Sequence, residues 1–205
     1  MKITHNNKTI QKLEKNPIFL LTGDIETTKF YSSLASACIK IGTYLEDKIE
    51  EKIRINFDIK QEIGQQSLFP TEEYFLVKQR FQKVEPDFVY IDENQKIIYV
   101  YEVKTNLGNA DSKKAHGEKI KYKTLYTFLT KKYLDYTVKI FVVDFMGDLS
   151  GATALYEASD IIEVIDGETF CKRIKIDYQT IINDLKLSQN HNKNFIKEFK
   201  KIEVC

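Results

Sequence analysis

The stretch that decides the fold is VEPDFVYIDENQKIIYVYEVKT, residues 84–105. Two runs rich in Val, Ile and Tyr flank the polar tetrapeptide Asp92-Glu93-Asn94-Gln95. Such apolar runs are typical of β-strands, and a polar cluster between them is typical of a turn. We therefore predict a β-hairpin whose strands are Val84–Ile91 and Lys96–Thr105.

The alternation of side chains along a strand relates the charged residues of this hairpin to one another. If the turn is centred on Glu93-Asn94, residue 91 faces residue 96 and Asp87 faces residue 100. Asp87, Glu102 and Lys104 then share one face of the sheet, and Asp87 is a diagonal neighbour of Glu102 at roughly 7–8 Å. A three-residue loop would reverse this parity and separate the groups.

Helices are expected before and after the hairpin. Apolar residues recur at steps of three and four from Phe30 to Ile53, which predicts an amphipathic helix. Further helices are predicted at Lys113–Leu134 and Gly167–Leu187. The side chains expected to face inward in the middle helix are Ala115, Ile120, Leu125, Phe128 and Leu129.

Three other segments are predicted to be extended. Glu72–Phe81 follows a Pro break, and Ile161–Ile165 is a short apolar run. Thr137–Phe145 is almost continuously apolar, which is typical of a strand buried on both faces. The succession helix, three strands, helix, strand predicts an α/β fold, a mixed β-sheet flanked by helices.

The composition limits the class of protein. The chain has 205 residues, which fits a single domain over residues 1–205, with a core at about 30–145 and a C-terminal extension at about 146–205. Hydrophobic residues make up 42% and charged residues 30%, which excludes a collagen-like or a disordered chain. The net charge is +1, which excludes a histone-like polycation but leaves a local basic face open.

The cysteines indicate a reducing compartment. Cys38, Cys171 and Cys205 are odd in number and far apart, so a disulfide framework is not expected, and they lack the paired spacing of a zinc site. No apolar run approaches the ~18 residues of a transmembrane helix. We expect a cytoplasmic protein that has no membrane partner.

Two carboxylates and one ammonium at the end of a strand suit metal-assisted hydrolysis of a phosphodiester. Hard oxygen ligands favour Mg²⁺, and two short acidic side chains can close around a cation because Mg–O bonds are about 2.1 Å. The metal polarises a phosphoryl oxygen and lowers the pKa of a bound water. The lysine can hold the phosphate or the attacking water and offset developing charge.

The strings Pro86-Asp87 and, fifteen positions after the aspartate, Glu102-Val103-Lys104 resemble the motif of the PD-(D/E)xK nuclease superfamily. The core of that superfamily is an α-β-β-β-α-β arrangement, and the predicted order of elements fits it. The resemblance implies a restriction-endonuclease-like core from about residue 30 to residue 145.

The resemblance also implies roles for individual side chains. By it, Asp87 and Glu102 are the metal ligands for Mg²⁺, and Lys104 is the catalytic lysine. Many members of the superfamily add a glutamate from the first core helix. Glu46 is the best candidate, because Gly42 lies one turn before it and allows close approach, and because it borders the apolar stripe of that helix.

Each of these features also has a plain structural interpretation. A Pro-Asp pair is common where a strand begins, because proline is tolerated at the first position. The motif Glu102-Val103-Lys104 can be a solvated ion pair on a strand. Glu46 lies on a helix rich in Glu and Lys, where an exposed charge is ordinary.

Candidate DNA contacts follow the hairpin in sequence. Five lysines lie between residues 113 and 123, and in a nuclease such lysines contact phosphates. A solvated helix face in a lysine-rich protein is the alternative interpretation. The candidates for DNA binding are Lys113, Lys114, His116, Lys119, Asn106 and Asn109.

The predicted function is that of a Mg²⁺-dependent endonuclease acting on double-stranded DNA, similar to a type II restriction enzyme. The chain is short and has no P-loop or dinucleotide motif. A palindromic target would imply a two-fold homodimer. Two alternatives stay open: a repair, recombination or RNA-processing nuclease of the same fold, and a non-catalytic nucleic-acid-binding module.

Overall fold

The computed structural model describes residues 16–57, 74–77, 80–81, 83–107, 112–147, 149, 156 and 159–187, and for residues 37–39, 74, 77 and 112–114 it describes only the backbone. The chain divides into two compact units. One comprises Met1–Leu45 with Gln179–Cys205, and the other comprises Glu46–Tyr178. The expectation of one nuclease domain over the whole chain stays a prediction.

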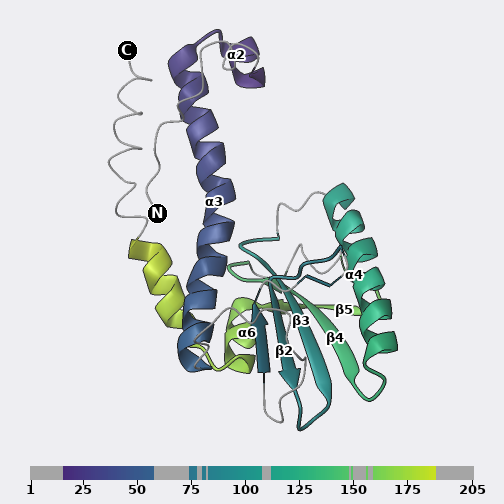
Figure 1. Ribbon diagram of the computed structural model, residues 1–205. Helices are drawn as coiled ribbons and strands as arrows, with labels where there is room; N and C mark the ends of the chain where they lie inside the picture. The colour runs from purple at the N-terminus through teal and green to yellow at the C-terminus, as the bar shows by residue number, and fades with distance from the viewer. Residues whose placement is uncertain are drawn as a thin grey trace. The chain divides into compact units, whose positions relative to one another are not determined.

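The second unit is built on a five-stranded sheet in the order β1-β2-β3-β4-β5. The first three strands form an antiparallel meander, and β4 and β5 continue it in parallel (Figure 1). The predicted mixed α/β sheet flanked by helices is therefore confirmed. The strands are β1 Tyr74–Val77, β2 Phe88–Asp92, β3 Ile97–Lys104, β4 Thr137–Asp144 and β5 Ile162–Asp166.

The hairpin of β2 and β3 differs from its predicted register by two residues. Asp92 pairs with Ile97 and Val89 with Val100, so the turn is centred one residue later than expected. The Asp92 carboxylate accepts a hydrogen bond from the Gln95 amide at 2.9 Å, and Lys96 has a φ of 53°. These two features close a four-residue turn. A shift of two residues leaves every side chain on its predicted face.

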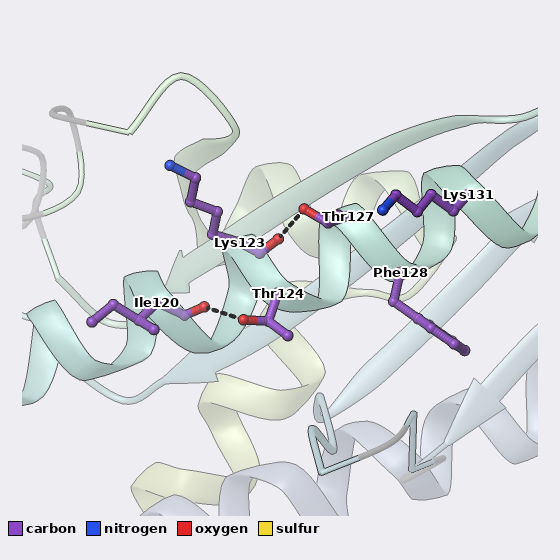
Figure 2. Close-up of a pocket in the computed structure, with 6 residues that line it drawn as sticks. All are labelled: Ile120, Lys123, Thr124, Thr127, Phe128 and Lys131. Carbon is purple, nitrogen blue, oxygen red and sulfur yellow. Dashed lines mark hydrogen bonds between the residues drawn. The ribbon is translucent and has the colours of Figure 1, made fainter.

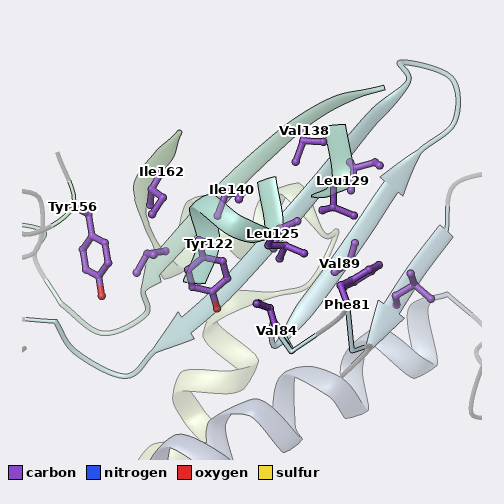
Figure 3. Close-up of a cluster of buried hydrophobic side chains, with 14 of the residues drawn as sticks. Phe81, Val84, Val89, Tyr122, Leu125, Leu129, Val138, Ile140, Tyr156 and Ile162 are labelled. Carbon is purple, nitrogen blue, oxygen red and sulfur yellow. The ribbon is translucent and has the colours of Figure 1, made fainter. Parts of the chain in front are cut away.

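The two faces of the sheet have different side chains. One face is covered by α4 (Ser112–Lys132), whose Leu125 and Leu129 pack on aliphatic residues of the strands (Figure 3). The opposite face is aromatic and is partly covered by α6 (Gly167–Arg173), whose Phe170 lies against Phe88 and Tyr101. The aliphatic residues of the first face are Val89, Ile91, Ile98, Val100, Val138, Ile140 and Val142.

Helix α4 confirms most of its predicted inward face. Ala115, Leu125 and Leu129 are buried, and Phe128 is half-buried against the same core, but Ile120 is 57% exposed and its predicted inward position is wrong. The buried face continues through Tyr122 instead, and Ile120 lies two residues from it, about 200° around the helix. Figure 2 shows Ile120 on the outer surface of α4, where it lines a surface hollow with Lys123, Thr124, Thr127, Phe128 and Lys131.

Strand β4 is only partly buried on both faces, so that prediction holds for its second half alone. Residues 140–144 are buried, whereas Thr137 and Lys139 are exposed. Arg173, the last residue of α6, lies over the Phe141 ring at 4.3 Å from its centroid. Thr137 and Lys139 precede Phe141 in the strand, and α6 ends at Arg173, over Phe141.

The predicted helix Gly167–Leu187 is wrong in its continuity. Helix α6 ends at Arg173, and residues 178–187 form a separate helix. Lys175 adopts a φ of 58°, and the Ile176 amide reaches back to the Cys171 carbonyl at 2.9 Å. A left-handed residue with such a bond ends an α-helix. The thiol of Cys171 is free and buried, and burial raises its pKa to about 12.

The first unit contains α2 (Pro17–Thr22), which was not predicted, and the beginning of α3 (Ile25–Asn56). The Asn16 side chain caps α2, and Gly23 ends it with a φ of 65°. The Asp24 carboxylate accepts from the Thr27 amide at 2.7 Å and so caps α3. None of the helices in the described residues is long and apolar enough to cross a membrane.

Candidate active site

Asp87 lies one residue before β2, which begins at Phe88. The buried Pro86 precedes it, where a missing amide costs no ladder hydrogen bond. Asp87 Oδ2 accepts a hydrogen bond from the Val103 amide of β3 at 2.7 Å. Continuing the β2–β3 register by one residue puts Asp87 directly opposite Glu102. The predicted diagonal pairing is thus corrected to a closer, direct one.

Glu102 and Lys104 lie on the α4 face at the carboxyl end of β3. Glu102 is only 6% exposed. Its Oε1 is 2.5 Å from Lys104 Nζ, and its Oε2 accepts a hydrogen bond from the Tyr122 hydroxyl of α4. Both oxygens of this buried carboxylate therefore have a donor, which offsets the cost of burying the charge.

A second carboxylate extends this network. Lys104 Nζ is 3.2 Å from Glu118 Oε1, and the Tyr156 hydroxyl donates to Glu118 Oε2 at 2.6 Å. The chain of contacts Tyr156, Glu118, Lys104, Glu102 and Tyr122 thus links α4, β3 and the segment before β5. Figure 3 shows the two tyrosines above the same face of the sheet. We call these five residues the Lys104 network.

The electrostatics single out Asp87. Burial raises the pKa of its carboxyl group, the neighbouring Glu102 and Glu46 raise it further, and the result is about 7 despite the Val103 amide and Lys104, which lower it. The Asp87 carboxyl group therefore gains or loses its proton near neutral pH. A cation placed beside it would favour its ionised form.

The other groups keep their protons. Burial lowers the pKa of Lys104, but Glu102 and Glu118 more than compensate, so the pKa of the ammonium is raised above its ordinary value. Burial raises the pKa of Tyr122, and Glu102 raises it further. Burial, followed by the hydrogen bond to Glu118, likewise raises the pKa of Tyr156. Lys104 is thus a fixed cation, and both tyrosines are hydrogen-bond donors at neutral pH.

Glu46 of α3 is half-buried and close enough to Asp87 to raise its pKa. The sequence placed Glu46 beside the apolar stripe of this helix, and within its own unit that stripe is confirmed by the buried Ile49 and Ile53. Glu46 therefore contributes negative potential to the cluster, and it acts on Asp87 through its charge.

The residues fit a magnesium site only in part. Within the described residues, no group of three or more Asp, Glu, His or Cys side chains is arranged to hold a metal ion. Asp87 and Glu102 supply carboxylate oxygens on one face, and such hard donors with added water are what Mg²⁺ takes. Glu102 would have to share its oxygens with Lys104 and Tyr122. The carboxylates that would hold the ion are Asp87 and Glu102.

The predicted DNA contacts are less well defined. His116 and Asn106 are exposed and Lys119 is half-buried. Lys113 and Lys114 lie in the first turn of α4, but their side chains are not described, and Asn109 lies outside the described residues. The DNA-binding role of all six residues stays a prediction.

Several polar residues of the site were not predicted from the sequence. Glu118 and Tyr122 are one helical turn apart, in line with Ala115 and Leu125, and this spacing was the available signal. Asp144 at the end of β4 was also missed: it is 1% exposed and accepts from the Leu107 amide at 2.8 Å. Gly147 permits this arrangement, because a Cβ there would collide with the Asp144 carboxylate.

No protein-family model, curated protein or solved structure matches this chain. What the site does is therefore inferred from its own geometry and from the motif resemblance.

Proposed function

We propose that this chain is a Mg²⁺-dependent endonuclease that hydrolyses phosphodiester bonds of double-stranded DNA at a specific sequence, as type II restriction enzymes do. The observation that supports the proposal is the meeting of Asp87, Glu102 and Lys104 on one sheet face. The order α3, β1, β2, β3, α4, β4 is the order of a restriction-endonuclease-like core, which we include in the proposal.

The charge balance of the site supports a metal requirement. The carboxylates of Glu102 and Glu118 act on the Lys104 ammonium, those of Glu46 and Glu102 act on Asp87, and Asp87 adds a further negative charge when it is ionised. Such a surplus of negative charge repels a phosphodiester until a cation offsets it. When bound, Mg²⁺ would supply Lewis-acid stabilisation of the phosphoryl oxygens and a more acidic water.

Lys104 is suited to bind the scissile phosphate. Its ammonium is kept protonated by Glu102 and Glu118, so it acts as a cation rather than as a general base. The two glutamates also fix its position from either side, at 2.5 and 3.2 Å. A fixed cation next to a phosphoryl oxygen stabilises the charge that develops there in the transition state.

Asp87 sets the pH range of the proposed reaction. A carboxyl group must lose its proton before it binds a metal ion, and the pKa of Asp87 is raised to about 7 by burial and by Glu102. We expect cleavage to increase with pH through this value, because the ionised fraction of Asp87 increases.

The remaining parts of the proposal concern DNA and assembly. His116 and Lys119 lie on α4 within one turn of Glu118 and would contact phosphates beside the site. A homodimer would present two such sites to a palindromic target. We also propose that the protein acts in the cytoplasm, where its DNA substrate and reducing conditions coexist.

One observation favours the second candidate, a non-catalytic nucleic-acid-binding module. Lys104 is paired with Glu102 and with Glu118, and each glutamate accepts a hydrogen bond from a tyrosine hydroxyl. A polar network in which every group has a partner can serve the stability and specificity of folding alone. A nuclease acting on branched DNA or RNA is the third candidate, and it shares the chemistry of the first.

A panel of substrates distinguishes these candidates. The full chain is incubated with supercoiled plasmid, branched DNA and structured RNA, each with Mg²⁺ or with EDTA. Discrete plasmid fragments that require Mg²⁺ are the expected result. Cleavage of only branched DNA or RNA would support the third candidate, and binding without hydrolysis of any substrate would contradict both nuclease proposals.

A further inference from the structure

The aromatic face of the sheet contains a cavity that the proposed nuclease site does not use. Its volume is about 340 Å³, and it lies over β2, β3, β4 and β5, on the side that α6 partly covers. Because side chains alternate along β3, its lining residues Tyr99 and Tyr101 point away from Glu102 and Lys104. The cavity is therefore a different site from the Lys104 network.

Four of the residues that line the cavity are aromatic: Tyr90, Tyr99, Tyr101 and Phe141. Tyr99 is stacked on Tyr90, with centroids 5.8 Å apart, and on Phe141, with centroids 6.3 Å apart. Tyr90 and Phe141 are buried, whereas Tyr99 is half-buried. Tyr99 thus adds a half-buried ring to the cavity lining, and its contacts with Tyr90 and Phe141 hold that ring in place.

The cavity is also lined by charged side chains. Lys139, Arg173 and Lys175 bring three cations to it, against the carboxylates of Asp92 and Glu163. Asp92 is 7% exposed, and its Oδ1 already accepts a hydrogen bond from the Gln95 amide. Glu163 is 3.8 Å from the Arg173 guanidinium, a long and mostly exposed pair of small energetic value. The cations therefore exceed the acids.

We propose that this cavity binds a nucleoside monophosphate, with the base stacked on Tyr99 and the phosphate held by Lys139 and Arg173. A planar ring matches the aromatic surface, since every nucleobase offers a π-face for stacking. The excess of cations matches a phosphate. The volume is at the lower end of the roughly 300–1,000 Å³ of small-molecule sites, enough for one nucleotide and not for several.

Arg173 is held in place for this role. Its guanidinium lies 4.3 Å from the centre of the Phe141 ring in a cation–π arrangement, and it also hydrogen-bonds Tyr101 and lies 3.8 Å from Glu163. Lys139 and Phe141 are two residues apart in β4, so their side chains point to the same side of the strand. The ammonium and the guanidinium thus enter the cavity from two different elements.

Titration calorimetry tests the proposal with four ligands: dAMP, dTMP, a 5′-phosphorylated dinucleotide and inorganic phosphate. We expect dAMP to bind more tightly than dTMP, because the purine ring is larger, and inorganic phosphate to bind at least about tenfold more weakly. No binding of either mononucleotide, or equal affinity for inorganic phosphate and dAMP, would overturn the proposal. The dinucleotide distinguishes two sources of the ligand. If it binds as tightly as dAMP, the site takes the end of a DNA strand, and if it binds more weakly than dAMP, the site takes a free nucleotide. Both results support the site.

Three variants assign the contacts. Tyr99→Leu keeps an apolar side chain but removes the ring, and we expect it to weaken dAMP binding by roughly tenfold, whereas Tyr99→Phe should retain it. Lys139→Ala should weaken dAMP binding by roughly fivefold. Lys131→Ala, on the outer face of α4, is the matched control and should change nothing. Equal loss in Lys139→Ala and Lys131→Ala would contradict the assignment.

This proposal does not depend on the proposed nuclease function, and the Lys104→Ala protein shows the difference. It should bind dAMP with unchanged affinity even though it lacks the proposed catalytic lysine. Loss of dAMP binding in that variant, with the fold unchanged by circular dichroism, would mean that the nucleotide occupies the Lys104 side of the sheet, and would overturn the second site.

Discussion

The two faces of β2 and β3 carry side chains of different chemistry. Asp87, Glu102 and Lys104 lie on the α4 face, and Phe88, Tyr99 and Tyr101 lie on the opposite face. Because strand side chains alternate, adjacent residues of one short sequence serve both faces. A cluster of buried charges is costly unless it is paired, while packed aromatic rings contribute to stability directly. The contrast assigns the proposed hydrolytic chemistry to the α4 face and aromatic packing to the opposite face.

The largest expected effect tests the charged residues on the α4 face. Lys104→Ala removes the ammonium that would bind the scissile phosphate, and we expect the cleavage rate to fall by roughly 10²–10³-fold. Lys96→Ala is the matched control, since Lys96 pairs with Glu93 on the same hairpin at 2.7 Å, and it is far from the network. The cleavage rate of each variant is measured as its rate of plasmid nicking and compared with that of the wild type. Undiminished cleavage in Lys104→Ala would refute the role of this residue.

The aromatic face should respond in stability instead. Phe88 is fully buried and is stacked on Phe170, so Phe88→Ala should lower the free energy of unfolding by about 3–5 kcal/mol. Denaturant unfolding measures the change. The milder Phe88→Leu should retain the cleavage rate of the wild type at a temperature where it is folded. If Phe88→Leu instead abolished cleavage without unfolding, the division of roles between the faces would be wrong.

Tyr122 belongs to the core cluster on the α4 face and connects it to the buried Glu102. Tyr122→Phe keeps the ring but leaves an oxygen of the buried Glu102 without its donor, which should destabilise the protein by about 1–3 kcal/mol. It should also weaken Mg²⁺ binding by about 10–100-fold, because Glu102 would lose its orientation. Tyr126→Phe on the same helix is the control. Identical behaviour of the two variants would show that the hydroxyl of Tyr122 has no special role.

The smallest effect concerns pH. The pKa of Asp87 is raised from its ordinary value of 3.8 to about 7, mainly by burial, so the folded protein binds an extra proton between these values. Its stability should therefore decrease as the pH rises from about 4 to about 7. Asp87→Asn removes this dependence and should be more stable than the wild type by about 1–3 kcal/mol at pH 8, with little difference at pH 4. Parallel pH profiles for both proteins would contradict the raised pKa.

Most of the sheet could be predicted from the sequence, because the strands of the second unit are strongly apolar and the hairpin turn is polar. The predicted face of Asp87, Glu102 and Lys104 was correct even though the register was wrong by two residues, since faces depend only on parity. The register itself depended on where the turn closed, and the left-handed Lys96 gave no signal in the sequence.

The network around Lys104 could not be predicted in full. Glu118 and Tyr122 are ordinary residues on a helix rich in lysine, and only the docking of α4 on the sheet brings them to Lys104. Tyr156 comes from a distant segment, and no local pattern relates it to Glu118. Ile120 was assigned to the core on its hydrophobicity, although the helical repeat turns it outward. Sites assembled from several elements depend on tertiary packing more than on local sequence.

If the proposed function is correct, the cluster of Asp87, Glu102 and Lys104 must be a metal-dependent hydrolytic centre. The most direct test is to incubate the full chain with DNA fragments of mixed sequence, with Mg²⁺ or with EDTA, and to sequence the ends of every break. We predict breaks that require Mg²⁺ and recur at one sequence. Breaks of equal frequency in EDTA, or none above those in a sample without protein, would contradict this function.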